Sequence, residues 1–190
     1  MKNWVYTANI VKSIFVAGEQ KSEQYLKVNP FGKVPALLVD GKLLTENPAI
    51  LIYLNSLPST NEILPKANDA FHQSQIYSDL MWLSSTLHPS VRHVCVPSYY
   101  TISENKEDVI ERGRIALSMN LNLAEKRLVG SQWWYGDKWS IVDTYLHWCY
   151  TRAERGGYSL ENFPALGAHQ KRVEKMPSYA KRKSIENNNL

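Results

Sequence analysis

The sequence predicts an α/β domain followed by an all-helical domain. Residues 4–54 combine runs of β-branched and aromatic residues with one stretch of helical spacing. Beyond residue 67, apolar residues recur every three to five positions, which is typical of helices packed on a common core. Between the two regions, LPSTNEILPK carries two prolines and polar residues. We therefore expect an α/β domain over residues 1–56, a linker over 57–67 and an all-helical domain over 68–190.

The bulk composition is that of an ordinary soluble protein. Of the 190 residues, 44% are apolar and 21% charged, and the formal net charge is +4. No apolar run approaches the ~18 residues of a membrane span, and polar residues in MKNWVYTANIVKSIF argue against a signal peptide. Cys95 and Cys149 are far apart and lack metal-ligand spacing. We expect a cytoplasmic protein with no membrane partner and no metal site.

Most basic residues are interspersed with acidic ones, which indicates a solvated face. The one denser basic cluster is KRVEKMPSYAKRK, close to the C-terminus. We interpret this cluster as surface and keep contact with an anion or RNA as a minor alternative. Nucleic acid is therefore not an expected partner.

The first domain begins with residues 4–17, whose β-branched and aromatic content predicts a strand. A polar connection follows, with a short helical turn over Glu23–Lys27. Two apolar runs, Ala36–Val39 and Leu43–Leu44, come next. Asp40-Gly41 joins them and predicts a hairpin, because a tight two-residue turn needs positive φ angles.

A helix is expected directly after this hairpin. Ile50, Leu51 and Leu54 lie at helical spacing. Asn47 stands where an N-cap belongs, and Pro48 stands at the first helical position, where its missing N–H costs no hydrogen bond.

Four helices are expected in the second domain. The first has one apolar face and a bend at Pro89, and its face comprises Phe71, Ile76, Leu80, Leu83, Leu87, Val91 and Val94. The others run over Ile110–Leu128 with Gly130 as the stop, over Ser140–Arg155 with Gly156-Gly157 as the stop, and from Pro164 to a point before Pro177. Ser140 and Asp143 have the spacing of a capping box, a stability device of about 1–2 kcal/mol to which we assign no chemistry.

The combination of NPFGKVPAL with TENPAI resembles the glutathione S-transferase family, and the likeness continues through WYGDKWSIVDTYLHW and FPALGAHQKRVEKMPS. The resemblance covers nearly the whole chain. It implies a thioredoxin-like N-terminal domain, here truncated, an all-helical C-terminal domain, a homodimer and a glutathione site in each subunit.

The resemblance also implies which residues bind glutathione. The proline that matches Pro35 is cis in the family, which leaves the Val34 N–H and C=O available to pair with the cysteinyl unit. The γ-glutamyl carboxylate docks at the helix N-terminus after Asn47. Many members of the family have serine at the position of Asn47. Glu46 balances the ligand's α-ammonium, and Lys33 reaches the glycine carboxylate.

The front of the chain departs from the family pattern. Only 17 residues precede Gly18, whereas a βαβ unit needs about 30, so the first strand and first helix have no sequence left to form them. The residue that activates the thiol is therefore not identified. In a second register, residues 4–6 form the first strand and Tyr6 is the hydrogen-bond donor.

Three explanations for this short front stay open. The chain is a truncated gene product, a degenerate member that binds without catalysing, or a protein whose missing strand comes from a neighbouring subunit. An exposed sheet edge would invite such pairing. We expect the isolated protein to be less stable, or more prone to associate, than a complete relative.

His88, Arg92 and Cys95 share one helix face. His88 resembles a histidine that some bacterial members place near the thiol and the second substrate, and we keep it as a catalytic candidate; a Cys95–His88 nucleophilic pair is a weaker one. Most of a set of large aromatic residues should lie in the core, with a few left to line a pocket for a hydrophobic co-substrate: Trp82, Tyr99, Tyr100, Trp133, Trp134 and Trp148.

The resulting hypothesis is a glutathione S-transferase-like protein that transfers the glutathione thiolate to a hydrophobic electrophile. The alternative is a non-catalytic glutathione-binding or protein-interaction module on the same fold, because this architecture hosts both.

Overall fold

The computed structural model describes residues 18–58 and 62–187. The strand predicted over residues 4–17, and Tyr6 with it, lie outside the described residues. The chain divides into two compact units, with the boundary between Glu62 and Ile63, and each is described here by itself. This boundary falls within the linker predicted over 57–67.

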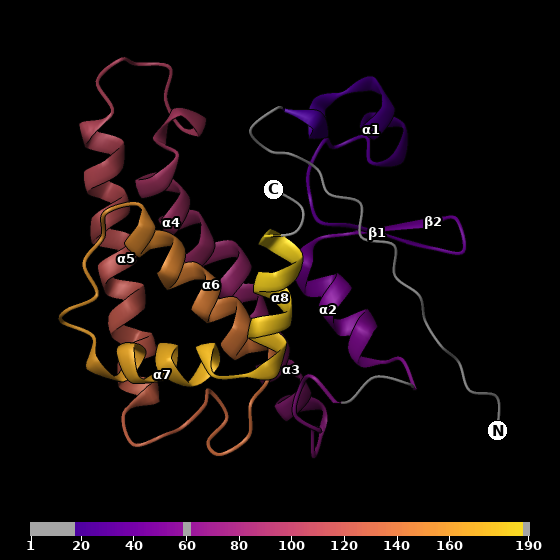
Figure 1. The fold of residues 1–190 in the computed structure, drawn as a ribbon, viewed down its shortest axis with the longest axis vertical. Helices are drawn as coiled ribbons and strands as arrows, with labels where there is room; N and C mark the ends of the chain where they lie inside the picture. Colours follow the sequence, from indigo (N-terminus) through magenta and orange to yellow (C-terminus); the bar gives the residue numbers. More distant parts are fainter. Residues whose placement is uncertain (1–17, 59–61, 188–190) are drawn as a thin grey trace. The chain divides into compact units, whose positions relative to one another are not determined.

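The described part of the first unit contains short helices and a hairpin (Figure 1). Its described elements are η2 (Glu19–Lys21), α1 (Glu23–Val28), β1 (Ala36–Val39), β2 (Lys42–Thr45) and α2 (Asn47–Asn55). Helix α1 confirms the predicted helical turn, and Ser22 caps it by accepting a hydrogen bond of 3.2 Å from the Tyr25 N–H.

The predicted hairpin is confirmed. Strands β1 and β2 pair antiparallel from Ala36↔Thr45 to Val39↔Lys42, so the loop between them is Asp40-Gly41. Both loop residues have positive φ, 49° and 76°, as the two-residue turn requires.

The start of α2 differs from the prediction by one residue. Glu46, rather than Asn47, occupies the N-cap position, and its C=O accepts the first helical hydrogen bond from Ile50 N–H at 3.0 Å. No side chain among the described residues caps this helix, so the expected capping by Asn47 was wrong. The cause is the φ of 68° at Glu46, which turns the chain into the helix one residue early.

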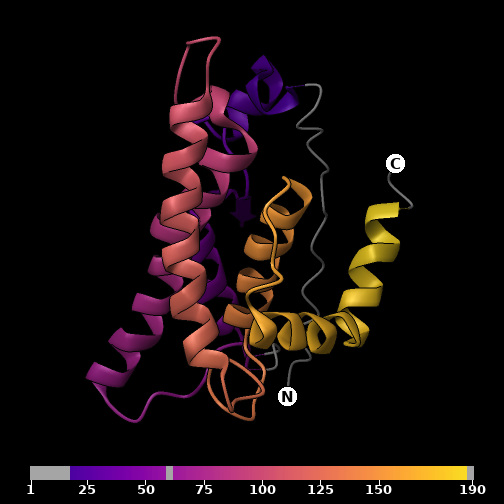
Figure 2. The same cartoon turned by 90° about the vertical axis from the view of Figure 1, so that its left-hand side faces the viewer.

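The second unit is all-helical, as predicted (Figures 1 and 2). Helix α8 was not predicted, and none of the described helices is long and apolar enough to cross a membrane. The described elements are α3 (Ala70–Trp82), the π-helical turn η3 (Leu83–Leu87), α4 (His88–Cys95), η4 (Pro97–Tyr99), α5 (Glu107–Leu128), α6 (Ile141–Arg155), α7 (Pro164–Glu174) and α8 (Pro177–Asn187).

The core of this unit follows the predicted apolar spacing. Helix α4 packs against α5 and α6, and α7 packs against the same two helices. Six of the seven predicted residues on the first face are buried, whereas Phe71 is 74% exposed, because it lies in the first turn of α3 at the edge of the unit. The helical path near Pro89 widens into η3, where the His88 N–H bonds to the Leu83 C=O five residues back. Such widening accommodates a proline that lacks an N–H.

The capping box at Ser140 and Asp143 is present and joins a larger buried network. Asp143 is fully buried and accepts hydrogen bonds from Ser140 N–H at 2.8 Å and from Trp134 N–H at 2.7 Å. Its Oδ1 also lies 3.1 Å from Nε2 of His169, whose Nδ1 lies 2.9 Å from the Tyr150 hydroxyl. One carboxylate thus ties the loop before α6 to both α6 and α7.

Candidate functional site

The loop that joins α1 to β1 is packed tightly at Gly32. Gly32 is buried with φ 57°, and a Cβ there would lie 2.9 Å from the Gln20 carbonyl oxygen and 2.9 Å from Lys21 Nζ. Its N–H donates to the Asn29 C=O at 2.9 Å. Only glycine fits this position, because both the backbone angle and the close approach exclude a side chain.

Two side chains from α1 and its end hold the next residue. The Tyr25 hydroxyl and the Asn29 Nδ2 amide both donate to the Lys33 C=O, each at 2.7 Å. Asn29 is 1% exposed and also accepts from the Phe31 N–H at 3.1 Å. Neither Tyr25 nor Asn29 was among the predicted site residues. The available signal was the position of Asn29 at the start of the NPFGKVP motif.

The N–H and C=O of Val34 come directly after the Lys33 carbonyl group in the chain. The Val34–Pro35 peptide bond is cis, as the family resemblance implied. The β1–β2 ladder begins only at Ala36, and no hydrogen bond between described residues uses the Val34 N–H or C=O. Val34 therefore offers one donor and one acceptor beside the strand. The Lys33 side chain next to it is exposed.

The N-terminus of α2 lies at the same end of the hairpin. Because Ala36 pairs with Thr45, residues 34–35 and 46–47 are the next positions on the two strands. Glu46 is exposed. Its φ of 68° is uncommon for a residue with a side chain, and backbone angles of this kind cluster at functional sites. The first N–H groups of the helix point out of its end and carry partial positive charge.

The first unit thus brings together four predicted residues, Val34, Pro35, Glu46 and Asn47, with Lys33 adjacent. The combination offers a main-chain pair for an extended peptide, a helix end for an anion, a carboxylate for an ammonium group and a lysine for a second anion. This set matches a short peptide that bears charges at both ends.

His88 lies in the second unit within an aromatic cluster. Its Nδ1 is 3.0 Å from the Tyr145 hydroxyl, and its ring centroid is 4.5 Å from that of Trp148. Burial, together with the nearby Arg92 guanidinium, lowers the pKa of His88 to about 4. The imidazole is therefore neutral at pH 7.

The two cysteines have no nucleophilic environment. Cys95 Sγ donates to the Arg152 C=O at 3.4 Å rather than to His88, and burial raises the pKa of its thiol. Cys149 is fully buried, which also raises the pKa of its thiol. The Cys95–His88 pair is therefore not formed, because each residue has another hydrogen-bond partner.

The expectation that most of the large aromatic residues are core was wrong. Of that set, Trp134 is buried, whereas Tyr99, Tyr100 and Trp148 are exposed. Arg92 lies over the Tyr99 ring at 5.0 Å, and His93 stacks on Tyr100 with centroids 3.7 Å apart. Tyr99 and Tyr100 therefore pack against a guanidinium and an imidazole at the surface rather than against the apolar core.

Both the sequence and the structure of this chain are similar to those of known proteins. Residues 6–56 match the family model of the glutathione S-transferase N-terminal domain. Glutathione S-transferase GST-4.5 from Xanthomonas campestris pv. campestris is 30% identical over 163 residues, which cover 83% of this chain and 77% of the relative. A maleylacetoacetate isomerase from Pseudomonas aeruginosa is 30% identical over 169 residues, which cover 87% and 78% of the two chains. The structure of a sphingomonad glutathione S-transferase complexed with glutathione is similar with a TM-score of 0.73 at 28% identity, over 87% of this chain and 79% of that one.

The alignments with the two relatives and with this structure extend through both units, since each covers more than four fifths of the chain. They confirm the predicted fold class, an N-terminal thioredoxin-like domain followed by an all-helical domain. With the NPFGKVPAL hairpin in the expected geometry, the chain belongs to the glutathione S-transferase family.

Proposed function

We propose that the protein binds glutathione at the open end of the hairpin and transfers its sulfur to an electrophilic small molecule. The observation that carries this proposal is the Val34 main-chain pair, unused by any described residue, beside the N-terminus of α2. A relative named as a glutathione S-transferase and a similar structure complexed with glutathione support the choice of ligand.

Each part of the tripeptide meets a matching group. The extended cysteinyl unit pairs with the N–H and C=O of Val34, and Pro35 ends this segment because it has no N–H to offer. The γ-glutamyl carboxylate lies at the helix N-terminus beside Asn47. Glu46 accepts from the α-ammonium, and Lys33 Nζ meets the glycine carboxylate.

The proposed chemistry is nucleophilic addition or substitution by sulfur. A thiol with a pKa of about 8.5 is mostly protonated at pH 7, so a hydrogen bond to sulfur is needed to favour the thiolate. The sulfur then forms a C–S bond, and the displaced electron pair leaves with a leaving group or enters the acceptor and takes up a proton. His88 is our candidate donor: in the neutral tautomer whose Nδ1 accepts from the Tyr145 hydroxyl, Nε2 carries the proton that can be donated to sulfur. Tyr6 is the alternative donor.

We also propose the class of co-substrate, the location and the assembly state of the protein. The electrophile is hydrophobic. The protein is cytoplasmic and forms a homodimer, and an apolar stripe on α5 supports the dimer because Ile115, Met119 and Leu123 are each more than half exposed at four-residue spacing.

Retention on immobilised glutathione, followed by conjugation of 1-chloro-2,4-dinitrobenzene, tests the proposal. We expect retention, elution by free glutathione, and turnover. Glu46→Gln should abolish retention, whereas Glu62→Gln, an exposed residue of the same unit, should not. Retention without turnover favours the non-catalytic binding module, and the absence of retention overturns the proposed ligand.

A further inference from the structure

The Lys33 carbonyl oxygen receives two strong hydrogen bonds from side chains that no sequence motif assigned. The Tyr25 hydroxyl and the Asn29 amide both reach it at 2.7 Å, from positions eight and four residues earlier in the chain. A carbonyl oxygen has two lone pairs, so both acceptor directions are taken. The carbonyl cannot rotate without breaking at least one of these bonds.

The Lys33 C=O shares its peptide plane with the Val34 N–H. Among the described residues the cis peptide bond is Val34–Pro35, so the Lys33–Val34 bond is trans. In a planar trans peptide the C=O and N–H point in opposite directions. A carbonyl held toward α1 therefore directs the Val34 N–H away from α1, and no described residue accepts from that N–H.

The two hydrogen bonds also change the donor itself. Donors on a carbonyl oxygen polarise the peptide group, so the N–H of the same plane becomes a stronger donor. Asn29 is nearly fully buried and is fixed by its further bond to the Phe31 N–H. Gly32, packed against Gln20, closes the loop that brings Lys33 within reach.

We propose that Tyr25 and Asn29 are positioning residues that orient and polarise the Val34 N–H for an acceptor on the ligand. This inference rests on the proposed function, in which that acceptor is the cysteinyl C=O of glutathione. Neither residue touches the ligand in this arrangement, and both act through one peptide group.

Tyr25→Phe is the sharper variant, because it removes one hydroxyl from a half-buried ring and leaves the buried Asn29 in place. A hydrogen bond of this kind is worth about 0.5–1.5 kcal/mol, and because it is already formed in the ligand-free protein, a loss in affinity of about 2- to 12-fold is the upper limit. We expect the dissociation constant for glutathione to rise by no more than that factor, with kcat close to wild type and the unfolding temperature lowered by a few degrees at most. Tyr53→Phe on α2 is the matched control, since no hydrogen bond between described residues uses its hydroxyl.

The Val34 amide resonance of the ligand-free protein gives a second readout that a merely structural role of Tyr25 would not move. In ¹⁵N-labelled protein, Tyr25→Phe should shift this resonance upfield, because the peptide is less polarised, whereas Tyr53→Phe should leave it in place. An unchanged Val34 resonance, or unchanged affinity in Tyr25→Phe, overturns the positioning role. If wild-type protein fails to bind glutathione, the proposed function falls instead, and the Val34 resonance still decides whether the two side chains act on this peptide.

Discussion

The Lys33 side chain is exposed, and no ion pair between described residues uses it. Its ammonium group is therefore available for a ligand carboxylate, while its main chain is held by α1. Lys33→Met should weaken glutathione binding by up to about 5-fold, the loss expected for a solvent-exposed charge pair. Isothermal titration calorimetry at low salt measures this change.

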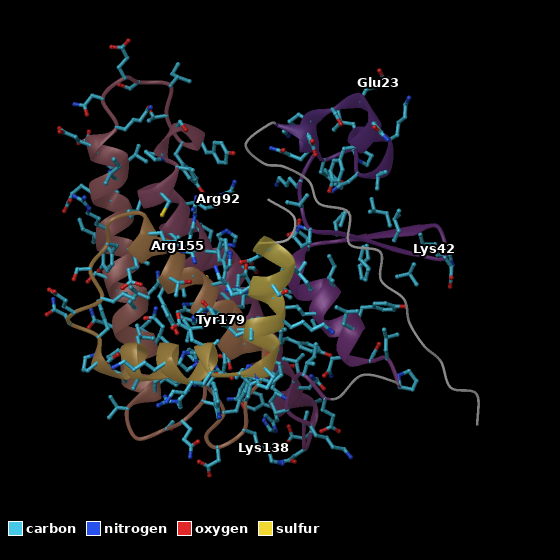
Figure 3. All side chains as sticks on the ribbon, in the orientation of Figure 1. Glu23, Lys42, Arg92, Lys138, Arg155 and Tyr179 are labelled. Atoms are coloured by element: carbon cyan, nitrogen blue, oxygen red, sulfur yellow. The ribbon has the colours of Figure 1, made fainter. Side chains whose placement is uncertain are left out.

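Lys42→Met provides the matched control for this prediction. Lys42 is also an exposed lysine and lies at the tip of the hairpin, the end opposite to Val34 (Figure 3). It should retain wild-type affinity. Equal weakening in both variants would point to net charge rather than to a contact made by Lys33.

His147 is 1% exposed between the rings of Tyr150 and Tyr179. Burial lowers the pKa of His147 to about 4, although Glu174, 3.5 Å from Nε2, acts in the opposite direction. The unfolded state has the ordinary value of about 6.5 and so binds more protons below that pH. The free energy of unfolding should therefore be constant above pH 6.5 and fall as the pH drops toward 4.

Urea unfolding at pH 7.5 and pH 5 tests this pH dependence. His147→Phe places an aromatic ring of similar size between the same two tyrosines and should reduce the loss of stability between these pH values. His88, whose pKa is lowered in the same way, accounts for a remaining slope. An unchanged loss in His147→Phe would assign the acid sensitivity to other groups.

The α6 capping box stabilises more than one helix. Asp143 bonds to the loop before α6, to the α6 N-cap and to His169 on α7. Asp143→Ala leaves buried donors without a partner and should cost about 3–5 kcal/mol of unfolding free energy. The exposed Asp137→Ala in the same loop should change stability by no more than about 0.5 kcal/mol. A cost near that of an isolated cap, about 1 kcal/mol, would contradict the wider role.

At the scale of elements, what the sequence predicts well depends on adjacent residues. Asp40-Gly41 determines its own turn, and the apolar spacing from Ile76 to Val94 identifies the buried face of α3, η3 and α4. The start of α2 was misplaced because the positive φ of Glu46 is imposed by surrounding structure rather than by local preference.

The features that the sequence did not predict depend on contacts that a local sequence pattern does not reveal. Helix α8 was interpreted only as a basic surface cluster, because Tyr179 and Ile185 are too few to define an apolar face. The roles of Tyr25 and Asn29 could not be predicted, since their shared acceptor is brought near only when the Gly32 loop closes.

At the scale of the whole molecule, the family and fold class were predictable because NPFGKVPAL and TENPAI constrain a backbone arrangement rather than a single side chain. The linker prediction was less sharp. Ile63 and Leu64, within the predicted linker, belong to the helical unit: Leu64 is buried and the Ile63 C=O accepts from the Ile141 N–H at 2.7 Å. Polar and proline content indicates a connection but not which of its residues pack.

The apolar stripe on α5 predicts the assembly state. Met119, at its centre, is 66% exposed. Met119→Glu places a charge in the proposed dimer interface and should convert a dimer to a monomer in light scattering after size-exclusion chromatography. Ile102→Glu, which replaces a fully exposed residue outside the stripe, should remain dimeric. A Met119→Glu variant that stays dimeric would move the interface to another surface.

The low reactivity of the Cys95 and Cys149 thiols has a practical consequence for any assay of conjugation. Both sulfurs remain protonated near neutrality because burial disfavours their anions. The polypeptide should therefore consume little of an added alkylating reagent by itself. Product that accumulates with catalytic amounts of protein would then originate from the tripeptide, with little background from the chain's own side chains.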